Sequence, residues 1–459
     1  MVDLSHYTLP DVLRQPPEAV RALQDRLLAE TIELCYRAHP FYSRLMRKEG
    51  LEPRHIRTTE DLKRLPPSSK VDFLNDPEAF RIDPAALPPE IGTLWKVIYT
   101  TGTTSGRPAP VYVTAHDHFT YLYACQQRQE LIGLKNTDLL ANLFPLTTFP
   151  MGAYSRAPDE ISAVGGAIMN AHTGRADTVY PLNRSLDDAV HAIARHRATV
   201  LWGVAGFVRR VLMRAEELGA DFSAVRQVMI TGEASSTAMR EDLARRMVKL
   251  GCADSRVVNR YGSTEQGGSM VECHPGSGFH SLAPEQLFHE VIDEATGERL
   301  PDGAEGMLAF THLSRRGTVF LRYLVGDLVS MTHETCPHCG RTSPRITSQP
   351  VRTGDVVKIK GTLVNLQVLK DQLDRTDGVE EYQIVIQPLD PKDPFSMDEL
   401  VVRLAAAPAQ REAIAGRIVE EARRITQVSP RIEYAERNDI YDPMVAAKPR
   451  RVVDLRQKR

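Results

Sequence analysis

A loop rich in hydroxyl groups stands out between Tyr99 and Ala109. It consists of Thr100, Thr101, Gly102, Thr103, Thr104, Ser105, Gly106, Arg107 and Pro108. Hydroxyls and unhindered backbone N–H groups are what a polyphosphate needs from a protein. The loop lacks the Gly-Lys-Ser/Thr ending of a Walker A motif, so a polyphosphate site of another kind is predicted. An ordinary polar surface turn is the alternative, because glycine and threonine also mark such turns.

A second group of polar residues, 259–265, combines an aromatic ring with a carboxylate. Its members are Asn259, Arg260, Tyr261, Gly262, Ser263, Thr264 and Glu265. A flat tyrosine ring can stack on a purine, and a carboxylate can hold Mg²⁺ against phosphates. Further along, Asp327 follows Gly326 in a stretch typical of a turn, where an acidic residue can accept ribose hydroxyls. A plain Gly-Asp turn is the alternative there.

Cysteine and histidine residues indicate a metal site. Cys336 and Cys339 have the Cys-x-x-Cys spacing of a metal knuckle or redox motif. Upstream, Cys273 and His280 would complete a tetrahedral Cys₃His zinc site, with His274 and His338 as alternative ligands. The alternative is a set of reduced thiols and imidazoles in a surface lobe of β-structure.

The composition bounds the class of protein that carries these groups. A chain of 459 residues is too long to fold around a single hydrophobic core, so two or three domains are expected. A net charge of −2 argues against nucleic-acid binding through bulk electrostatics. Met1–His6 resembles no signal peptide, no run approaches the roughly 18 apolar residues of a membrane helix, and six cysteines are too few for a disulfide framework. These features predict a cytoplasmic protein with no membrane partner.

Strand and helix patterns alternate around the polar motifs. Apolar stretches at 199–202, 228–230 and 256–259 read as strands, and residues 207–218 and 235–250 as the helices between them. Such alternation predicts a mainly parallel sheet, in which ligands bind beyond the carboxyl ends of the strands. Two motifs follow such ends: residues 259–265, and the group Gly232, Glu233 and Ala234 after Thr231.

The predicted fold class is α/β and α+β, in two parts. A large domain over residues 1–351 would hold helix-covered sheets and a β-rich subdomain between residues 287 and 323. Short alternating elements from residue 352 onward read as a small α+β domain, 352–459. The boundary is placed at about residue 351, where the character of the sequence changes.

Taken together and in order, the motifs resemble those of the adenylate-forming superfamily of acyl- and aryl-CoA synthetases, adenylation domains and luciferases. The resemblance includes the loop 100–108, the Tyr-Gly-x-Thr-Glu motif at 261–265, the Gly-Asp turn, a hinge-like stretch at 352–361, and Lys448. This chain departs from the family's motifs at several positions. Ser105 is inserted, Ala109 replaces a lysine, Val325 replaces a threonine, and Gly354 replaces the hinge aspartate. The chain is most similar to phenylacetate–CoA ligases, as residues 336–346 show.

This resemblance implies a two-step reaction and a role for each matching residue. A carboxylate would attack the α-phosphorus of ATP to give acyl-AMP, and coenzyme A would then displace AMP after the small domain rotates. Loop residues 100–106 and 232–234 would bind ATP, together with Asn259, Arg260 and Gly262. Tyr261 would lie against adenine, Thr264 would contact the α-phosphate, and Glu265 would bind Mg²⁺. Asp327 would bind ribose, Arg352 ribose or phosphates, and Lys448 would neutralise charge during adenylation.

The identity of the acid is the least determined prediction. Phe149, Trp202, Phe207 and Tyr261 offer aromatic walls near the expected acid pocket, which favours an aromatic acid, although the same rings could be ordinary core. Transfer to a carrier-protein phosphopantetheine is an alternative to coenzyme A. A zinc-knuckle interaction protein is an alternative of another class, and a homodimer is left open.

Overall fold

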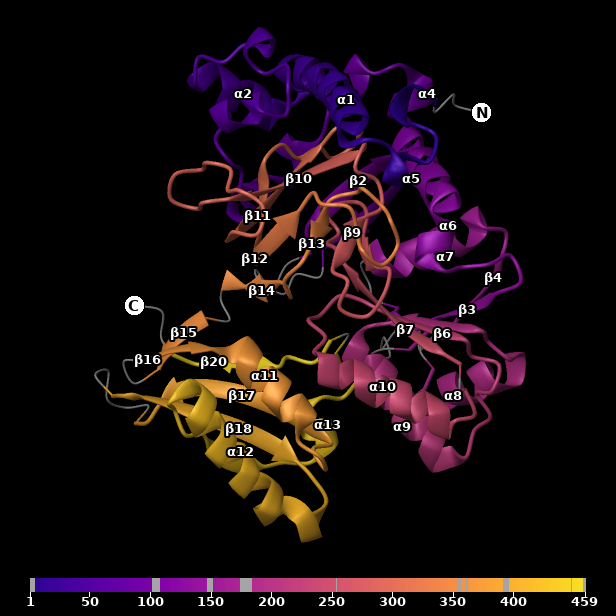
Figure 1. The fold of residues 1–459 in the computed structure, drawn as a ribbon, viewed down its shortest axis with the longest axis vertical. Helices are drawn as coiled ribbons and strands as arrows, with labels where there is room; N and C mark the ends of the chain where they lie inside the picture. The colour runs from indigo at the N-terminus through magenta and orange to yellow at the C-terminus, as the bar shows by residue number, and fades with distance from the viewer. Residues whose placement is uncertain are drawn as a thin grey trace. The chain divides into compact units, whose positions relative to one another are not determined.

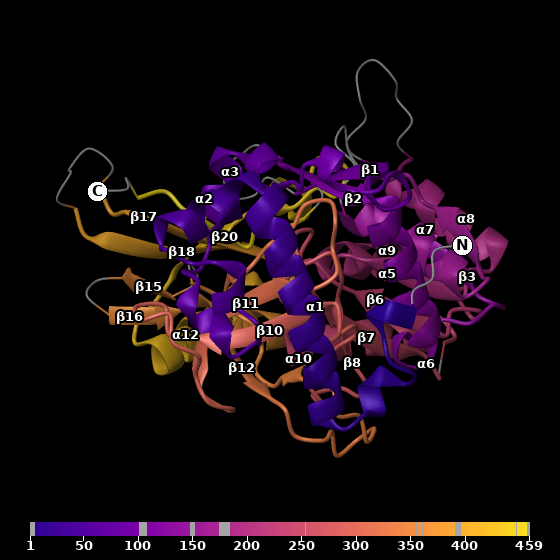
Figure 2. The same ribbon diagram turned by 90° about the horizontal axis from the view of Figure 1, so that it is seen from above.

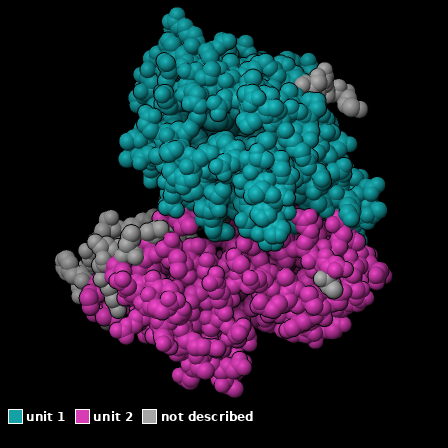
Figure 3. Space-filling model, viewed as in Figure 1, with its two compact units in different colours: residues 1–142, 147–169, 258–350 teal, residues 143–146, 170–257, 351–459 magenta. Residues whose placement is uncertain are grey.

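The computed structural model describes residues 5–100, 108–146, 152–173, 184–252, 254–353, 356–359, 362–390, 396–446 and 448–456. The chain divides into two compact units, which Figure 3 colours separately. Unit 1 comprises residues 1–142, 147–169 and 258–350, and unit 2 comprises residues 143–146, 170–257 and 351–459. The predicted loop residues Thr101, Gly102, Thr103, Thr104, Ser105 and Gly106, as well as Phe149 and Gly354, lie outside the described residues.

Unit 1 combines helices with mainly antiparallel strands (Figure 1). Its helices are α1 (Pro17–Ala38), α2 (Pro40–Lys48), α3 (Lys70–Asn75), α4 (Pro89–Gly92), α5 (Ala115–Gln127), α6 (Gln129–Ile132) and α7 (Gly152–Ala163). Its strands are β1 (Leu94–Tyr99), β2 (Pro110–Thr114), β3 (Leu139–Asn142), β8 (Met270–Glu272), β9 (Phe279–Ser281), β10 (Leu287–Ile292), β11 (Glu305–His312), β12 (Tyr323–Thr332) and β13 (Arg345–Ile346). Strands β4 (Ala167–Asn170) and β7 (Arg256–Tyr261) each cross a limit of this unit.

The strands of unit 1 pair into a hairpin and a larger sheet. Strands β1 and β2 form an antiparallel hairpin in which Tyr99 faces Pro110, so the hydroxyl-rich loop joins two paired strands. In the sheet, β10, β11, β12, β13, β9, β8 and β7 follow one another in that order. The sheet therefore brings the segments that follow β7 and β8 close to the segments that flank β9 and β13.

Aromatic side chains pack together in the core between α1, α2 and this sheet. Figures 1 and 2 show these two helices and the sheet. Phe80 is fully buried, and its ring stacks on Phe41 with centroids 4.3 Å apart. The rings of Phe73 and Phe320 lie 5.5 and 5.4 Å from it. Burial of aromatic surface, together with edge and stacked contacts of this kind, is the main stabilising contribution available to such a core.

Unit 2 contains parallel strands and a second, smaller sheet. Its helices are α8 (Leu186–His196), α9 (Ala205–Leu218), α10 (Thr237–Lys249), α11 (Leu366–Arg375), α12 (Arg411–Thr426) and α13 (Arg437–Ile440). Its strands are β5 (Val200–Gly203), β6 (Gln227–Ile230), β14 (Val351–Arg352), β15 (Val356–Ile359), β16 (Thr362–Asn365), β17 (Glu381–Pro388), β18 (Asp398–Ala405), β19 (Arg431–Tyr434) and β20 (Val452–Asp454). Strands β5 and β6 pair in parallel and are buried throughout, as the sequence predicts.

The C-terminal part of unit 2 has a core of its own. Strands β19, β18, β17 and β20 form a sheet in that order, and α11 and α12 cover one of its faces (Figure 1). Alternate residues such as Ile384 and Val402 face these helices and pair directly across the strands. The predicted α/β and α+β fold class is confirmed. The division into domains 1–351 and 352–459, and the rotation of the second, stay predictions.

None of the described helices has both the length and the apolar content that a membrane span requires.

The aromatic cluster generates a stability prediction. We expect Phe80→Ala to lower the free energy of unfolding by about 3–5 kcal/mol, because it deletes a fully buried ring and leaves a cavity. Phe119→Ala is the control, because this ring is 42% exposed. Urea unfolding of both variants measures the difference. Equal losses of unfolding free energy in the two variants would contradict the role of Phe80 as a core residue.

Candidate functional site

Strand β7 ends at Tyr261, and its last residues connect to two neighbouring elements of unit 1. The hydroxyl of Tyr261 donates to Asp327 Oδ2 at 2.6 Å, so the aromatic ring and the carboxylate predicted to bind a nucleoside lie side by side. Asp327 is buried on β12, while Tyr261 is partly exposed. Asn259, two residues earlier on β7, is buried. The arrangement offers a partly exposed ring with an acceptor at its rim.

The side chain of Arg260 points into the protein interior. Its guanidinium donates to both carboxylate oxygens of Glu160 on α7, at 2.7 and 2.8 Å, and both side chains are fully buried. The hydroxyl of Tyr121 on α5 donates to the same carboxylate at 2.5 Å. A bidentate pair of this kind is rigid. The guanidinium of Arg260 is thus engaged with Glu160, and any contact that residue makes to ATP would fall to its backbone.

Helix α7 also holds the motif that follows β7. The guanidinium of Arg156 donates to the carbonyl oxygens of Ser263 and Thr264, each at 3.3 Å. Gly152, the first residue of the helix, lies so close to Thr264 that a Cβ there would sit 2.9 Å from the threonine hydroxyl. Glycine is therefore required for this approach. Together these contacts fix the backbone that presents Thr264 and Glu265.

Two further predicted residues of unit 1 lie in ordered surroundings. The carboxylate of Glu265 is almost buried and lies 3.9 Å from the Lys70 ammonium at the start of α3. Thr100 closes the base of the hydroxyl-rich loop: its N–H donates to the Ala109 carbonyl at 3.0 Å, and its hydroxyl accepts from the Ala109 N–H at 2.9 Å. The structure thus describes the base of that loop, while its tip is outside the described residues.

In unit 2, the residues after β6 come together with a lysine from the end of the chain. Gly232 has φ of 88°, a left-handed conformation that suits glycine. Its carbonyl accepts from Lys448 Nζ at 2.5 Å. The neighbouring Glu233 carboxylate accepts from the Gly206 N–H. Burial raises the pKa of Glu233, against the opposing charges of Arg451 and Lys448.

The predicted aromatic residues of unit 2 also lie near this point. Trp202 lies in β5, and Phe207 lies in the first turn of α9; both are buried. The ring of Phe144 packs edge-on against Trp202 with centroids 5.7 Å apart. Ala234 follows Glu233 directly, and Arg352 is exposed on β14. Unit 2 by itself therefore holds buried aromatic rings and a fixed cation. Unit 1 by itself holds the Tyr261–Glu265 motif and Asp327.

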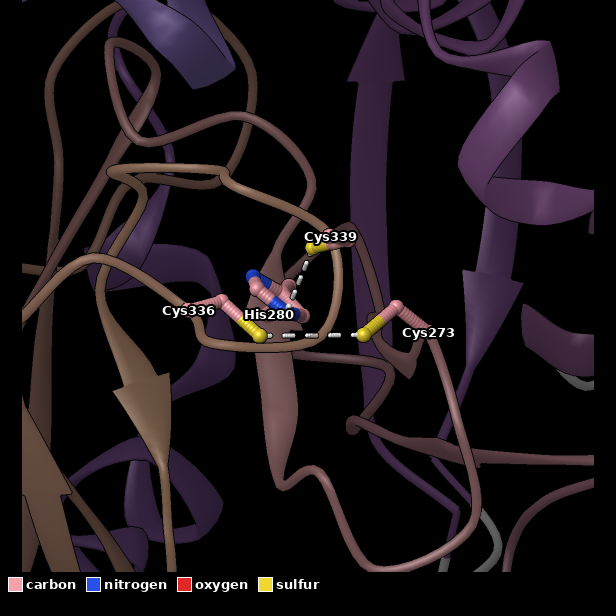
Figure 4. Close-up of side chains that lie close together, drawn as sticks. All are labelled: Cys273, His280, Cys336 and Cys339. Carbon is pink, nitrogen blue, oxygen red and sulfur yellow. Dashed lines mark hydrogen bonds between the residues drawn. The ribbon is translucent and has the colours of Figure 1, made fainter.

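Three cysteines and a histidine of unit 1 converge on one point (Figure 4). Their ligand atoms all lie within 4.8 Å of one another. Cys273 follows β8, His280 lies in β9, and Cys336 and Cys339 lie in the turn before β13. Because β8, β9 and β13 are neighbours in the sheet, pairs distant in sequence become neighbours in space. His274 and His338, the alternative ligands, instead stack on each other outside this group.

The spacing of this group matches a tetrahedral ion. The sulfurs of Cys273 and Cys336 are 3.8 Å apart, and Cys339 Sγ lies 3.5 Å from His280 Nε2. Zinc bonds of ordinary length at a tetrahedral angle would give about 3.8 and 3.6 Å. Burial, with the charges of Arg345 and Arg341, lowers the pKa of His280 to about 3, so the ring is neutral. With Nδ1–H donating to the Ser343 hydroxyl at 3.1 Å, Nε2 keeps its lone pair for a metal.

Sequence reasoning missed the residues that support the motifs. Glu160, Arg156 and Lys70 contact Arg260, the Ser263–Thr264 backbone and Glu265. A signal for the first two was present, because residues 154–160 combine several charges with small and aromatic residues. Their partners lie about a hundred positions away, which no local pattern reveals.

Comparison with known proteins adds three findings. A family profile described as "AMP-binding enzyme" matches residues 43–324. The chain is 28% identical over 426 residues to a phenylacetate–coenzyme A ligase of Thermus thermophilus, covering 92% of this chain and 91% of the relative. It is 25% identical over 467 residues to a phenylacetate–coenzyme A ligase of Aromatoleum evansii, covering 98% of each.

A solved structure shows a similar fold. It is a 2-hydroxyisobutyryl-CoA ligase in the postadenylation state in complex with 2-HIB-AMP. The TM-score is 0.80 at 21% sequence identity, over 99% of this chain and 94% of that one.

The buried Arg260–Glu160 pair generates a prediction about stability. Glu160→Gln should lower the free energy of unfolding by about 3–5 kcal/mol, because it leaves the Arg260 charge buried without its partner. Glu30→Gln is the matched control, since the pair of Glu30 with Arg26 is solvent-exposed and should contribute less than about 1 kcal/mol. Urea unfolding measures both variants. A loss of unfolding free energy in Glu160→Gln that is no larger than in Glu30→Gln would contradict this account.

Proposed function

The chain belongs to the AMP-binding enzyme family, and we propose that this AMP-forming acid–CoA ligase acts on an aromatic carboxylic acid. It joins the acid to AMP and then transfers the acyl group to coenzyme A. The aromatic nature of the acid is supported by the buried rings of Trp202, Phe207 and Phe144 in unit 2. Apolar walls with a few fixed polar groups are the usual composition of a small-molecule pocket.

The position of Lys448 is the observation that carries the proposal. This lysine lies 216 residues from Gly232 in sequence, yet its ammonium donates to the Gly232 carbonyl next to the Glu233 carboxylate. An ordinary lysine in a basic tail would be solvated instead. A cation held at a fixed point can stabilise the negative charge that develops as a carboxylate attacks the α-phosphorus of ATP. We assign this role to Lys448.

The residues of unit 1 bind and orient the nucleotide. Tyr261 supplies a flat ring for the purine, and Asp327, held at the rim of that ring, accepts the ribose hydroxyls. Thr264 donates to the α-phosphate from a backbone that Arg156 and Gly152 fix in place. The hydroxyl-rich sequence that follows Thr100 offers the groups that terminal phosphates require. No protein nucleophile is required, because the attacking atom belongs to the acid substrate.

Glu265 would hold Mg²⁺ against the phosphates. Its carboxylate is a hard oxygen ligand of the kind that Mg²⁺ prefers, and it lies near the end of a rigid motif. When bound, the ion would neutralise phosphate charge during adenylation. The nearby Lys70 ammonium, 3.9 Å away, pairs with this carboxylate and orients it.

The test of the proposed function is acid-dependent exchange of pyrophosphate into ATP in the presence of Mg²⁺. A panel of benzoic, arylacetic and fatty acids separates the substrate classes. Exchange with aromatic acids, followed by thioester formation on addition of coenzyme A, is expected. Exchange with fatty acids alone would refute the aromatic assignment, and absence of ATP binding would refute the adenylating reaction.

Removal of the Lys448 charge should affect the first step. We expect Lys448→Ala to lower the rate of acid-dependent pyrophosphate exchange about 10²–10³-fold, because a fixed electrostatic contact to the transition state is lost. Lys249→Ala, at the end of α10 in the same unit, is the matched control and should leave the rate unchanged. Normal exchange in Lys448→Ala would refute its assignment.

Removal of the Glu265 charge should show itself as a changed demand for magnesium. Glu265→Gln keeps the size of the side chain but loses its charge, so half-maximal exchange should need at least about tenfold more Mg²⁺. Glu294→Gln, in an exposed turn of the same unit, should behave like the unmodified protein. An unaltered Mg²⁺ dependence for Glu265→Gln would remove this residue from the metal site.

We also propose that Cys273, His280, Cys336 and Cys339 bind structural Zn²⁺. The set closes all four tetrahedral positions with protein ligands, which is the arrangement of structural rather than catalytic sites. The Ser343 contact fixes the orientation of the histidine ring. The ion would join β8 and β9 to the turn before β13.

Elemental analysis tests the zinc proposal. Purified protein should hold about one zinc per chain, and Cys339→Ser should lose most of it, because a hydroxyl replaces a thiolate ligand. Cys252→Ser is the control, since that thiol is buried elsewhere and already donates to the Phe222 carbonyl at 2.7 Å. Equal zinc content in both variants, or none in the unmodified protein, would refute the site.

A further inference from the structure

Unit 1 contains a partly open cavity of about 80 Å³ between α5, α7 and the segment that follows Glu265. Helices α5 and α7 lie side by side in both views (Figures 1 and 2). Much of the wall is apolar, with Val113, Tyr121 and Met270 among its residues. Charged side chains face the same space. Apolar walls with a few charged groups are typical of a site that orients a small ligand.

The cavity adjoins the residues assigned to adenylation. Arg156 lines it and, from the same position, holds the carbonyls of Ser263 and Thr264. The residues directly after Glu265, 266–270, form another part of the wall. Because Arg156 borders both the motif and the cavity, a group of the acid that extends past Thr264 would reach this space.

Positive charge exceeds negative charge along the wall. Among the lining residues Lys96, Arg156 and Arg315 are cations, and Asp117 and Asp159 are carboxylates. The lining histidines are neutral near pH 7, because burial lowers the pKa of His118, His289 and His312. The environment therefore favours a group that carries negative charge.

Hydrogen-bond donors also exceed acceptors. Asp117 already accepts from the N–H groups of Thr114, Arg316 and Gly317 at 3.1, 2.7 and 2.9 Å. Asp159 is paired with Lys96. Within the described part of the chain, Arg315 Nε is buried without a hydrogen-bond acceptor, although it lies within ion-pair distance of Asp117 Oδ2, at 3.8 Å. A buried donor of this kind costs free energy until an acceptor reaches it.

The volume restricts what can enter. At about 80 Å³, the cavity has room for a few waters or for one compact functional group. A nucleoside or a pantetheine arm is far too large. An apolar cavity that binds benzene measures about 150 Å³, so a whole ring does not fit either. Only a substituent of a ring fits.

We propose that this cavity receives a compact hydrogen-bond-accepting substituent, best matched by a second carboxylate, at the far end of the aromatic acid. The proposal rests on the proposed function and narrows its substrate class. Lys96 and Arg315 donate to the substituent, and the apolar wall holds the ring carbons next to it. Lys96 is a specificity residue in this account and takes no part in the chemical step.

A substituted series of benzoic and phenylacetic acids tests the proposal by pyrophosphate exchange. The series compares hydrogen, methyl, nitro and carboxylate at the same ring position. We expect kcat/KM for the nitro or carboxylate acid to exceed that of the methyl acid at least about tenfold, because methyl matches in size but accepts no hydrogen bond. Preference for hydrogen or methyl would overturn the proposal while leaving the proposed function intact. No exchange with any acid, whatever its class, would reject the function itself.

Two variants locate the preference in this cavity. Lys96→Met combined with Asp159→Asn removes the ion pair without leaving a buried unpaired charge. It should reduce the preference over methyl at least about tenfold, chiefly through KM. Lys135→Met, an exposed lysine of the same unit, is the control. Ala124→Val serves if the double variant does not fold, because it narrows the cavity without changing charge and should also abolish the preference. An unchanged preference in the folded variants would overturn the proposal.

Discussion

The buried ion pair between Arg260 and Glu160 is the constraint on which the rest of the site depends. Two charges removed from water are tolerated only when geometry and hydrogen bonding are nearly complete. Here both carboxylate oxygens accept from the guanidinium, and Tyr121 adds a further donor. The pair fixes the end of β7 to α7 and brings α5 to the same point. The same helix supplies Arg156, so Thr264 and Glu265 are presented from a backbone that two basic side chains hold.

Unit 2 holds its functional groups by a different principle. Backbone geometry at Gly232 turns a carbonyl toward Lys448, and the partly buried carboxylate of Glu233 is oriented by the Gly206 N–H. The C-terminal segment of this unit is bound to residues 170–257 by polar contacts, among them Ser236 to Asp374 at 2.6 Å and Arg209 to the Glu380 carbonyl at 2.6 Å. Hydrogen bonds of this kind can be exchanged more readily than an apolar core.

Much of the fold followed from the sequence, because strand and helix periodicity are local. The alternation between residues 199 and 259 predicted β5, β6, β7 and the helices between them. The four residues Cys273, His280, Cys336 and Cys339 were also predicted as a group. The order of the strands brings them together, while His274 and His338 stack outside the group. What the sequence could not show was which distant charges meet. Arg260 was assigned to ATP on the strength of its motif, although its guanidinium binds Glu160 on a helix that had no clear pattern. The cavity beside α7 depends on packing among several segments and leaves no local signature.

The most direct test follows the products of each step by mass spectrometry. The enzyme is first incubated with ATP, Mg²⁺ and an aromatic acid, and coenzyme A is added afterwards. We predict acyl-AMP and pyrophosphate before the addition, and acyl-CoA and AMP after it. Formation of ADP instead of acyl-AMP would contradict the account. Acyl-AMP that does not react with coenzyme A but does react with the phosphopantetheine of a carrier protein would also contradict the account.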